Sequence, residues 1–307
     1  MTPDVRPTAE QRARLDELAQ LLNGCRDVFM AAFDDGMLNP AAGSQAEHDF
    51  ALELKGPSGA WPADVNVQPR ALAAKLVRQQ ADYCVALGAL IAAGEVFDPM
   101  SSLVRGAFEY GIRVTWVIDP SANDPAHPEA GHRVRSARTL LMELVSTHHF
   151  REALSDRKDL EEGRARLRTM WQRLRRLAGE MFTDVVIDGD PSRWQLDGVR
   201  FQSWTTIAGT WADLEGSPVF GNRLYQLLAV EGHPQGFTAT PGLRAGQHGP
   251  ERALDMEDVV NRVQLAVGSF YSALTLLANY HGYTSSVIAD WEVRIEAMLP
   301  TAFWQVQ

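Results

Sequence analysis

The chain has 307 residues, of which 45% are hydrophobic and 22% are charged, and its formal net charge is −10. A chain of this length and composition buries a sizeable core, which excludes a protein that is disordered over most of its length. The acidic balance argues against a surface that contacts nucleic acid over its whole extent, and it leaves only a local basic face for such contacts.

Two features of the sequence predict a cytoplasmic protein without a membrane partner. The first residues, MTPDVRPTAEQRARLDELAQ, lack the apolar core of a signal segment, and no run reaches the roughly 18 apolar residues that a membrane-spanning helix needs. Cys25 and Cys84 lie far apart and have no metal-ligand spacing, which is typical of a reducing compartment.

The first third of the chain predicts two helices on either side of an irregular stretch. The pattern from Thr8 predicts an amphipathic helix that begins with a capping box formed by Thr8 and Gln11. Residues 36–69 are rich in Gly and Pro and hold at most a short strand or helical turn, so we expect a surface excursion or the cover of an active site. From residue 70 the sequence predicts a strong helix that stops at Gly94.

The next stretch, MSSLVRGAFEYGIRVTWVID from Met100 to Asp119, predicts a helix that its neighbours enclose, because most of its residues are apolar. Arg105, Glu109 and Arg113 drift only about 40° per step at helical pitch, so they form one stripe. Since a buried charge needs a partner, we expect Arg–Glu–Arg pairing along the helix. Two interpretations stay open: an ion ladder that fixes helix register, or the lining of a polar cavity that binds a ligand.

The rest of the chain predicts further helices and one small β element. A long helical pattern runs from about residue 133 to residue 182 and can break near residues 155–159. Residues 183–203 predict a β-hairpin, because the segments VVI and VRF flank two Asp-Gly turn signals. Helical patterns return at residues 217–231, 254–280 and 284–298, with a Gly- and Pro-rich loop over residues 232–250. The sequence therefore predicts one all-α domain over residues 1–307, a single large helical bundle with a small β-hairpin.

A group of titratable residues on the long helix suggests chemistry. Glu143, His148 and Glu152 are near one another at helical spacing, and helical bundles build metal sites from inward Glu and His side chains. The paired Glu-x-x-His motifs of di-iron carboxylate proteins are absent, so proximity alone makes these residues candidate metal ligands. The other interpretation is a partly exposed His pair, His148 and His149, near a helix break.

Arginines are concentrated on the second half of the same helical pattern. Arg164, Arg168 and Arg175 share a face that can contact the phosphates of RNA or of a nucleotide. Glu161 and Glu162 flank them, so a solvated, salt-bridged helix is the alternative. The sequence has no Walker loop and no GxGxxG, GxSxG or HExxH motif, and it identifies no cofactor.

Two short segments carry a resemblance to a known family. In NRLYQLLAVEGHPQG, Tyr225 and His233 close a predicted helix, and the central helix carries the pair Arg105 and Glu109. This combination resembles a group of bacterial helical proteins, uncharacterised or linked to defence, that are related to the HEPN fold, although Ala229 stands where their pattern prefers Ser. The resemblance implies an all-α bundle, a homodimer, and a link to RNA or nucleotides. It also implies that Arg105, Glu109, Tyr225 and His233 meet in one polar pocket.

The chain departs from that family in the motif for RNA cleavage. Ribonucleases of the HEPN fold carry an Arg and a His that are separated by four to six residues. Arg244 and His248 are separated by one residue too few, and Arg138 and His148 lie too far apart. The resemblance therefore implies a binding or interaction role without ribonuclease activity.

Two hypotheses of different class follow from these residues. The first is a HEPN-like helical bundle that binds a ligand, a nucleotide or RNA, with Arg105, Glu109, Arg113, Tyr225 and His233 as binding residues. The alternative is a cytoplasmic all-α enzyme that acts on a small molecule in a buried polar pocket, with or without the help of a metal ion. Its candidate catalytic residues are Glu109, His148 and His233.

Overall fold

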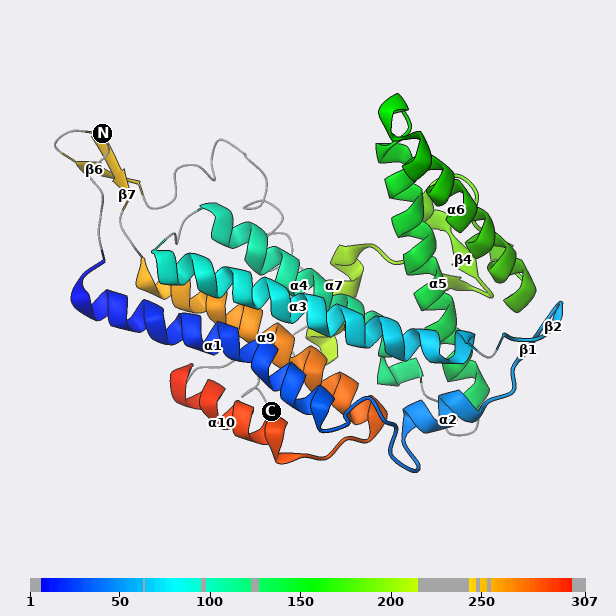
Figure 1. Cartoon of the computed structure of the whole chain (residues 1–307), viewed down its shortest axis with the longest axis horizontal. Helices are drawn as coiled ribbons and strands as arrows, with labels where there is room; N and C mark the ends of the chain where they lie inside the picture. Colours follow the sequence, from blue (N-terminus) through cyan, green and yellow to red (C-terminus); the bar gives the residue numbers. More distant parts are fainter. Residues whose placement is uncertain are drawn as a thin grey trace. The chain divides into compact units, whose positions relative to one another are not determined.

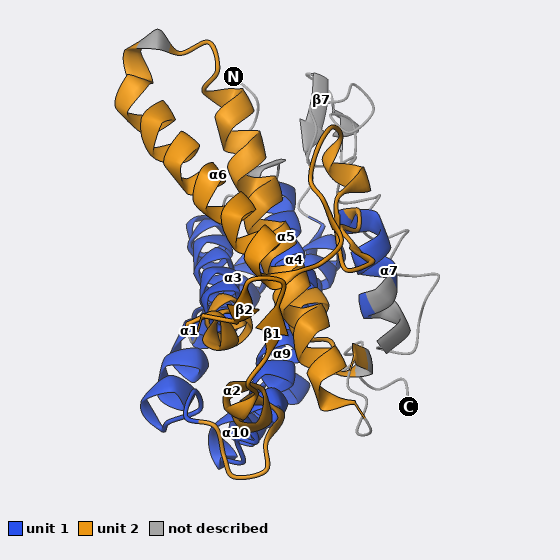
Figure 2. Ribbon diagram, turned by 90° about the vertical axis from the view of Figure 1, so that its right-hand side faces the viewer, with its two compact units in different colours: residues 1–39, 74–115, 204–307 blue, residues 40–73, 116–203 orange. Residues whose placement is uncertain are grey.

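The computed structural model describes residues 7–62, 64–94, 98–122, 127–214, 243–246, 249–252 and 255–299. Within these ranges helices dominate, and the strands form only two- and three-stranded sheets (Figure 1). The chain divides into unit 1, residues 1–39, 74–115 and 204–307, and unit 2, residues 40–73 and 116–203 (Figure 2). The all-α class with a small β addition is confirmed, and the single domain over residues 1–307 stays a prediction.

Unit 1 is built almost entirely from helices. Its helical elements, two of which extend into unit 2 at one end, are α1 (Ala9–Asp34), α3 (Gln68–Ala93), α4 (Asp98–Ile118), α7 (Trp204–Leu214), α9 (Met256–His281) and α10 (Ser286–Met298). The strands β6 (Leu243–Gly246) and β7 (Gly249–Arg252) pair as an antiparallel hairpin.

The ends of these helices follow from their capping residues. The backbone N–H of Gln11 donates to Thr8 Oγ1 over 3.2 Å, and the N–H of Thr8 donates to Gln11 Oε1 over 2.9 Å, so the predicted capping box is confirmed. Helix α3 ends before Gly94, whose φ of +82° is a conformation that glycine adopts without strain. Gly282, with φ +66°, ends α9 in the same way.

A close contact between α3, α4 and α9 lies in the core of unit 1. A methyl group at Gly111 of α4 would lie 2.7 Å from Gln80 Nε2 and 3.1 Å from the carbonyl oxygen of Ser269, so this approach requires glycine. Within the contact, Gln80 Nε2 donates to Ser269 Oγ over 3.1 Å. Apolar side chains of unit 1 that have no exposed surface include Leu18, Phe108, Ile112, Phe270 and Leu274. Both cysteines, Cys25 and Cys84, are free and buried.

Unit 2 contains a hairpin of two long helices, α5 (Pro128–Ala153) and α6 (Glu161–Met181), joined by residues 154–160. The predicted break near residues 155–159 is confirmed. Beside the helices, β3 (Val185–Val186), β4 (Gln195–Leu196) and β5 (Val199–Arg200) form an antiparallel sheet in that order. The segments VVI and VRF therefore do not pair with each other, because the tight turn at Asp197-Gly198 places β4 between them.

Three segments differ from the expectation drawn from sequence. Residues 36–69, predicted to be irregular, contain α2 (Gln45–Ala51), the antiparallel strands β1 (Lys55–Gly56) and β2 (Gly59–Ala60), and a 3₁₀ turn. Helix α7 was not predicted, because WTTIAGTWADL is short and contains Thr, Trp and Gly, which have modest or low helix propensity. Strands β6 and β7 lie inside the predicted loop 232–250 or at its edge. The predicted helix over residues 217–231 lies outside the described residues.

A buried charged cluster connects α2 to α5 within unit 2. Asp49 and Arg135 are each 1% exposed, and they form a bidentate ion pair with N to O distances of 2.7 and 2.6 Å. The Nδ1 atom of buried His132 lies 3.2 Å from Asp49 Oδ2. Burial raises the pKa of Asp49, but the contacts with His132 and Arg135 outweigh burial and hold this pKa well below its usual range. Asp49 is therefore ionised, and α2 is fixed to the start of α5.

Replacing Asp49 by Asn leaves Arg135 buried without its counter-charge, so we expect the free energy of unfolding to fall by about 3–5 kcal/mol. Equilibrium unfolding in urea measures this change. Asp159 provides a matched control, because its carboxylate pairs with Arg157 at the surface, where Asp159→Asn should leave stability close to wild type. An Asp49→Asn variant as stable as the wild type would contradict the role given to the pair.

The ion pair between Asp49 and Arg135 also makes the stability of the fold depend on pH, and this stability falls as the solution becomes acidic. Because the pKa of Asp49 is lower in the folded chain than in the unfolded chain, its contribution is complete above the ordinary carboxyl pKa of about 4. The contribution is lost as the pH falls from there toward the lower pKa of the folded state. Below about pH 4 the urea midpoint should therefore fall more steeply for the wild type than for Asp49→Asn.

Candidate functional site

The α5–α6 hairpin brings polar side chains together near its turn. Farther from the turn the two helices are held by buried apolar residues, which include Leu141 and Leu144 on α5 and Leu174 and Ala178 on α6. Residues 148–152 of α5 and 164–168 of α6 line one cavity together with Ser155 of the connecting segment, so the end of α5 faces the beginning of α6. The apolar contacts between α5 and α6 therefore position the polar side chains near the turn.

A layer of aromatic rings supports the polar side chains. The ring of Trp194, which is 1% exposed, lies 5.2 Å from the ring of His148 in an edge-on arrangement and 5.5 Å from the ring of Trp171. The guanidinium of Arg151 lies over Trp171, 4.9 Å from the ring centre. These contacts restrict the rotamers of His148 and Arg151, because each side chain rests on a ring that is itself packed.

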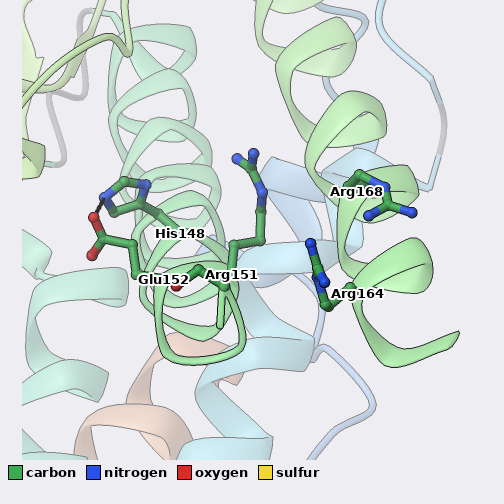
Figure 3. A pocket seen from close by; sticks show the side chains of 6 residues that line it. His148, Arg151, Glu152, Arg164 and Arg168 are labelled. Atoms are coloured by element: carbon green, nitrogen blue, oxygen red, sulfur yellow. Dashed lines mark ion pairs between the residues drawn. The ribbon is translucent and has the colours of Figure 1, made fainter. Parts of the chain in front are cut away.

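A cavity of about 340 Å³ opens between the two helices. Its lining is mostly charged and consists of His148, Arg151, Glu152, Ser155, Arg164 and Arg168. In Figure 3, Arg151 projects from α5 between the pair His148 and Glu152 on one side and Arg164 and Arg168 of α6 on the other. Three guanidinium groups from two helices therefore line one cavity.

The charges of this cavity are only partly balanced. His148 Nε2 lies 3.2 Å from Glu152 Oε1, so one carboxylate is paired with the imidazole. Glu161 places Oε1 2.7 Å from Arg168 Nη2 and Oε2 3.4 Å from Arg164 Nη1. Among the described residues Arg151 forms no ion pair. The guanidinium groups thus outnumber the carboxylates beside them, and the cavity favours an anion.

Glu161 is the carboxylate that holds the two arginines of α6. A hydrogen bond from Arg168 and the positive charges of Arg168 and Arg164 lower the pKa of Glu161. Glu161 therefore remains ionised near neutral pH. One carboxylate oxygen faces each guanidinium, so a single carboxylate bridges two arginines that are four residues apart on the helix.

The structure brings together residues that the sequence placed in two separate groups. His148 and Glu152, taken as candidate metal ligands, share the cavity with Arg164 and Arg168 of the predicted basic face. Arg175 of that face does not line the cavity and pairs with Asp188 over 3.1 Å. Arg151 was missed, although it follows His148 by three residues and so falls on the same side of the helix.

The proposed metal ligands do not form a metal site in the described part of the chain. Glu143 is exposed and is not part of the cavity lining, whereas His148 and Glu152 form a pair. No group of three or more His, Cys, Asp or Glu residues within the described ranges is placed to hold a metal ion. Tyr225 and His233 lie outside the described residues, so their convergence with Arg105 and Glu109 stays a prediction.

The predicted ion ladder on the central helix is present in unit 1. Arg105 Nε donates to Glu109 Oε1 over 2.8 Å, and Arg113 Nη2 lies 3.5 Å from Glu109 Oε2. The three side chains are 18–25% exposed, and the guanidinium of Arg113 stacks on Trp204 at 4.3 Å. The Arg–Glu–Arg pairing is confirmed, and ligand binding by this stripe stays a prediction.

Comparison with known proteins gives no match for this chain among family models, curated proteins or solved structures. None of the described helices is both long enough and apolar enough to span a membrane.

Replacing Glu109 by Gln removes the carboxylate that Arg105 and Arg113 share, and we expect the free energy of unfolding to fall by about 2 kcal/mol. Thermal unfolding followed by circular dichroism measures the loss. If the stripe is only an ion ladder, Arg105→Ala lowers the melting temperature with similar severity. If either variant keeps the wild-type melting temperature and loses a ligand that native mass spectrometry detects on the wild type, the polar-cavity interpretation is favoured instead.

Proposed function

We propose that this chain is a helical-bundle protein that binds a phosphate-bearing ligand, such as a nucleotide or RNA, in the cavity between α5 and α6. The observation that carries the proposal is the convergence of Arg151, Arg164 and Arg168 on one cavity of about 340 Å³ (Figure 3). A guanidinium keeps its charge at all physiological pH values and offers paired N–H donors that match two phosphate oxygens.

The size and the surroundings of the cavity also support this function. Its volume falls within the roughly 300–1,000 Å³ of ordinary small-ligand sites. The net charge of the whole chain is −10, so a local excess of guanidinium groups would select anions at this place and not over the entire surface. The HEPN resemblance implies the same class of ligand from different residues. The HEPN-like identity, the homodimer and the cytoplasmic location are parts of this proposal.

Replacing Arg168 by Ala should weaken the binding of adenosine 5′-monophosphate by about tenfold or more, because a charge-assisted hydrogen bond to phosphate is lost. Isothermal titration calorimetry at low ionic strength measures the affinity. Arg166→Ala is the matched control: Arg166 lies on the same helix, is 78% exposed, pairs with Glu162 and does not line the cavity. Equal losses in both variants would indicate attraction to the basic helix as a whole and would contradict a specific cavity.

The alternative function, an enzyme that acts on a small molecule, is favoured by one observation. His148 Nε2 lies 3.2 Å from Glu152 Oε1 at the edge of the cavity, and a carboxylate that contacts an imidazole orients it for proton transfer. His148 would then act as the general acid or base on a ligand that the arginines hold.

The test of this alternative is turnover at a site that still binds. The wild type, incubated with adenosine 5′-monophosphate, would give a new phosphorus resonance in ³¹P nuclear magnetic resonance spectra if it converts the ligand. His148→Gln should retain binding and lose this resonance. The glutamine amide is polar, as histidine is, but it does not act as an acid or a base near neutral pH. Unchanged spectra for the wild type would leave binding as the function of the cavity.

A further inference from the structure

We propose that Arg151 is the main anion contact of the α5–α6 cavity, and that Trp171 is a positioning residue that sets the affinity for the anion by holding Arg151. The inference rests on the proposed function and adds to it the residue on which binding depends most. Arg151 lines the cavity and Trp171 does not, so any effect of Trp171 on the ligand has to pass through a residue that the ligand touches.

The three arginines of the cavity differ in the partners that they already have. Arg168 Nη2 lies 2.7 Å from Glu161 Oε1, and Arg164 Nη1 lies 3.4 Å from Glu161 Oε2. An anion that binds these two guanidinium groups therefore competes with a carboxylate of the chain. Within the described ranges Arg151 forms neither an ion pair nor a side-chain hydrogen bond, and its guanidinium lies 4.9 Å from the ring centre of Trp171. Arg151 is also partly buried, whereas Arg168 is 50% exposed and more strongly screened by water and salt.

The contact with Trp171 holds Arg151 without using its hydrogen-bond donors. A guanidinium over the face of an aromatic ring is attracted by the negative charge of that face, and the attraction involves the cation as a whole. The N–H groups of the guanidinium stay available to oxygen atoms. A carboxylate in place of the ring would occupy some of these donors and neutralise the charge. Trp171 therefore fixes Arg151 and leaves it able to bind an anion.

The ring of Trp171 also reduces the entropy that is lost on binding. An arginine side chain without a partner populates many rotamers, and ordering it on binding costs affinity. Trp171 is itself held, because its ring lies 5.5 Å from that of Trp194, which is 1% exposed. Arg151 is therefore ordered before the anion arrives. Loss of the Trp171 ring should weaken binding although this ring does not line the cavity.

The chain offers a matched control on the same ring. The guanidinium of Arg175 lies 6.0 Å from the ring centre of Trp171, but it pairs with Asp188 over 3.1 Å and does not line the cavity. Arg175→Ala thus removes a positive charge near Trp171 from outside the cavity. Its affinity for an anion should stay close to that of the wild type.

The experiment measures the affinity of the full chain for adenosine 5′-monophosphate by ³¹P nuclear magnetic resonance titration at low ionic strength, which follows dissociation constants into the millimolar range. We expect Arg151→Ala to lose more affinity than Arg168→Ala or Arg164→Ala. Trp171→Leu should lower the affinity by about threefold to tenfold, because the cation–π contact and the ordering of Arg151 are both lost. Circular dichroism melting curves establish that each variant folds.

A double variant separates positioning from damage to the structure. If Trp171 acts through Arg151, Trp171→Leu lowers the affinity of the wild type and has no further effect in the Arg151→Ala background. An equal loss in both backgrounds would mean that the cavity as a whole is disturbed, and it would overturn the positioning role. Trp171→Phe keeps a smaller ring and serves in the same cycle if Trp171→Leu does not fold. Its loss should be smaller and should also vanish without Arg151.

The outcomes distinguish this inference from the proposed function. If Arg151→Ala loses no more affinity than Arg168→Ala, Arg151 is not the main contact, although phosphate binding stands. A loss in Arg175→Ala as large as that in Trp171→Leu would indicate attraction to nearby positive charge and would also overturn the inference. Failure of the wild type to bind adenosine 5′-monophosphate would overturn the inference together with the proposed function.

Discussion

A charged side chain on an enclosed helix face loses part of its hydration, and its counter-charge has to come from the chain itself. This constraint governs both units of the protein. In unit 1 the carboxylate of Glu109 serves two arginines one turn away on either side. In unit 2 the buried carboxylate of Asp49 meets Arg135 from a different helix, so that charge pairing also fixes α2 to α5. In unit 1, two guanidinium groups therefore share one carboxylate.

Among the described residues, the balance is also incomplete at the cavity between α5 and α6. Glu152 is directed to His148, and a single carboxylate, that of Glu161, is shared between Arg164 and Arg168. Arg151 rests on the ring of Trp171 in place of an acid. The aromatic layer thus holds a guanidinium that pairs with no carboxylate among the described residues, and the proposed function assigns its counter-charge to an anion from solution.

Much of the fold was accessible from local sequence patterns. The capping box of Thr8, the stop at Gly94 and the break between α5 and α6 were predicted because each depends on a few neighbouring residues. The pairing of Arg105, Glu109 and Arg113 was predictable for the same reason, since all three lie on one helix. Helix α7 was missed because it is short and contains residues of modest or low helix propensity, and α2 because it is short and lies in a stretch rich in Gly and Pro.

The candidate site separates what the sequence predicts from what only the tertiary structure shows. The sequence by itself determined that His148 and Glu152 share a helix face and that Arg164 and Arg168 share another, because helical periodicity fixes neighbours within one helix. Only the tertiary structure decided that these two faces meet, that Arg151 joins them, and that Asp49 lies against Arg135. Contacts between helices depend on how the turn and the apolar faces orient them, and helical spacing carries no information about that orientation.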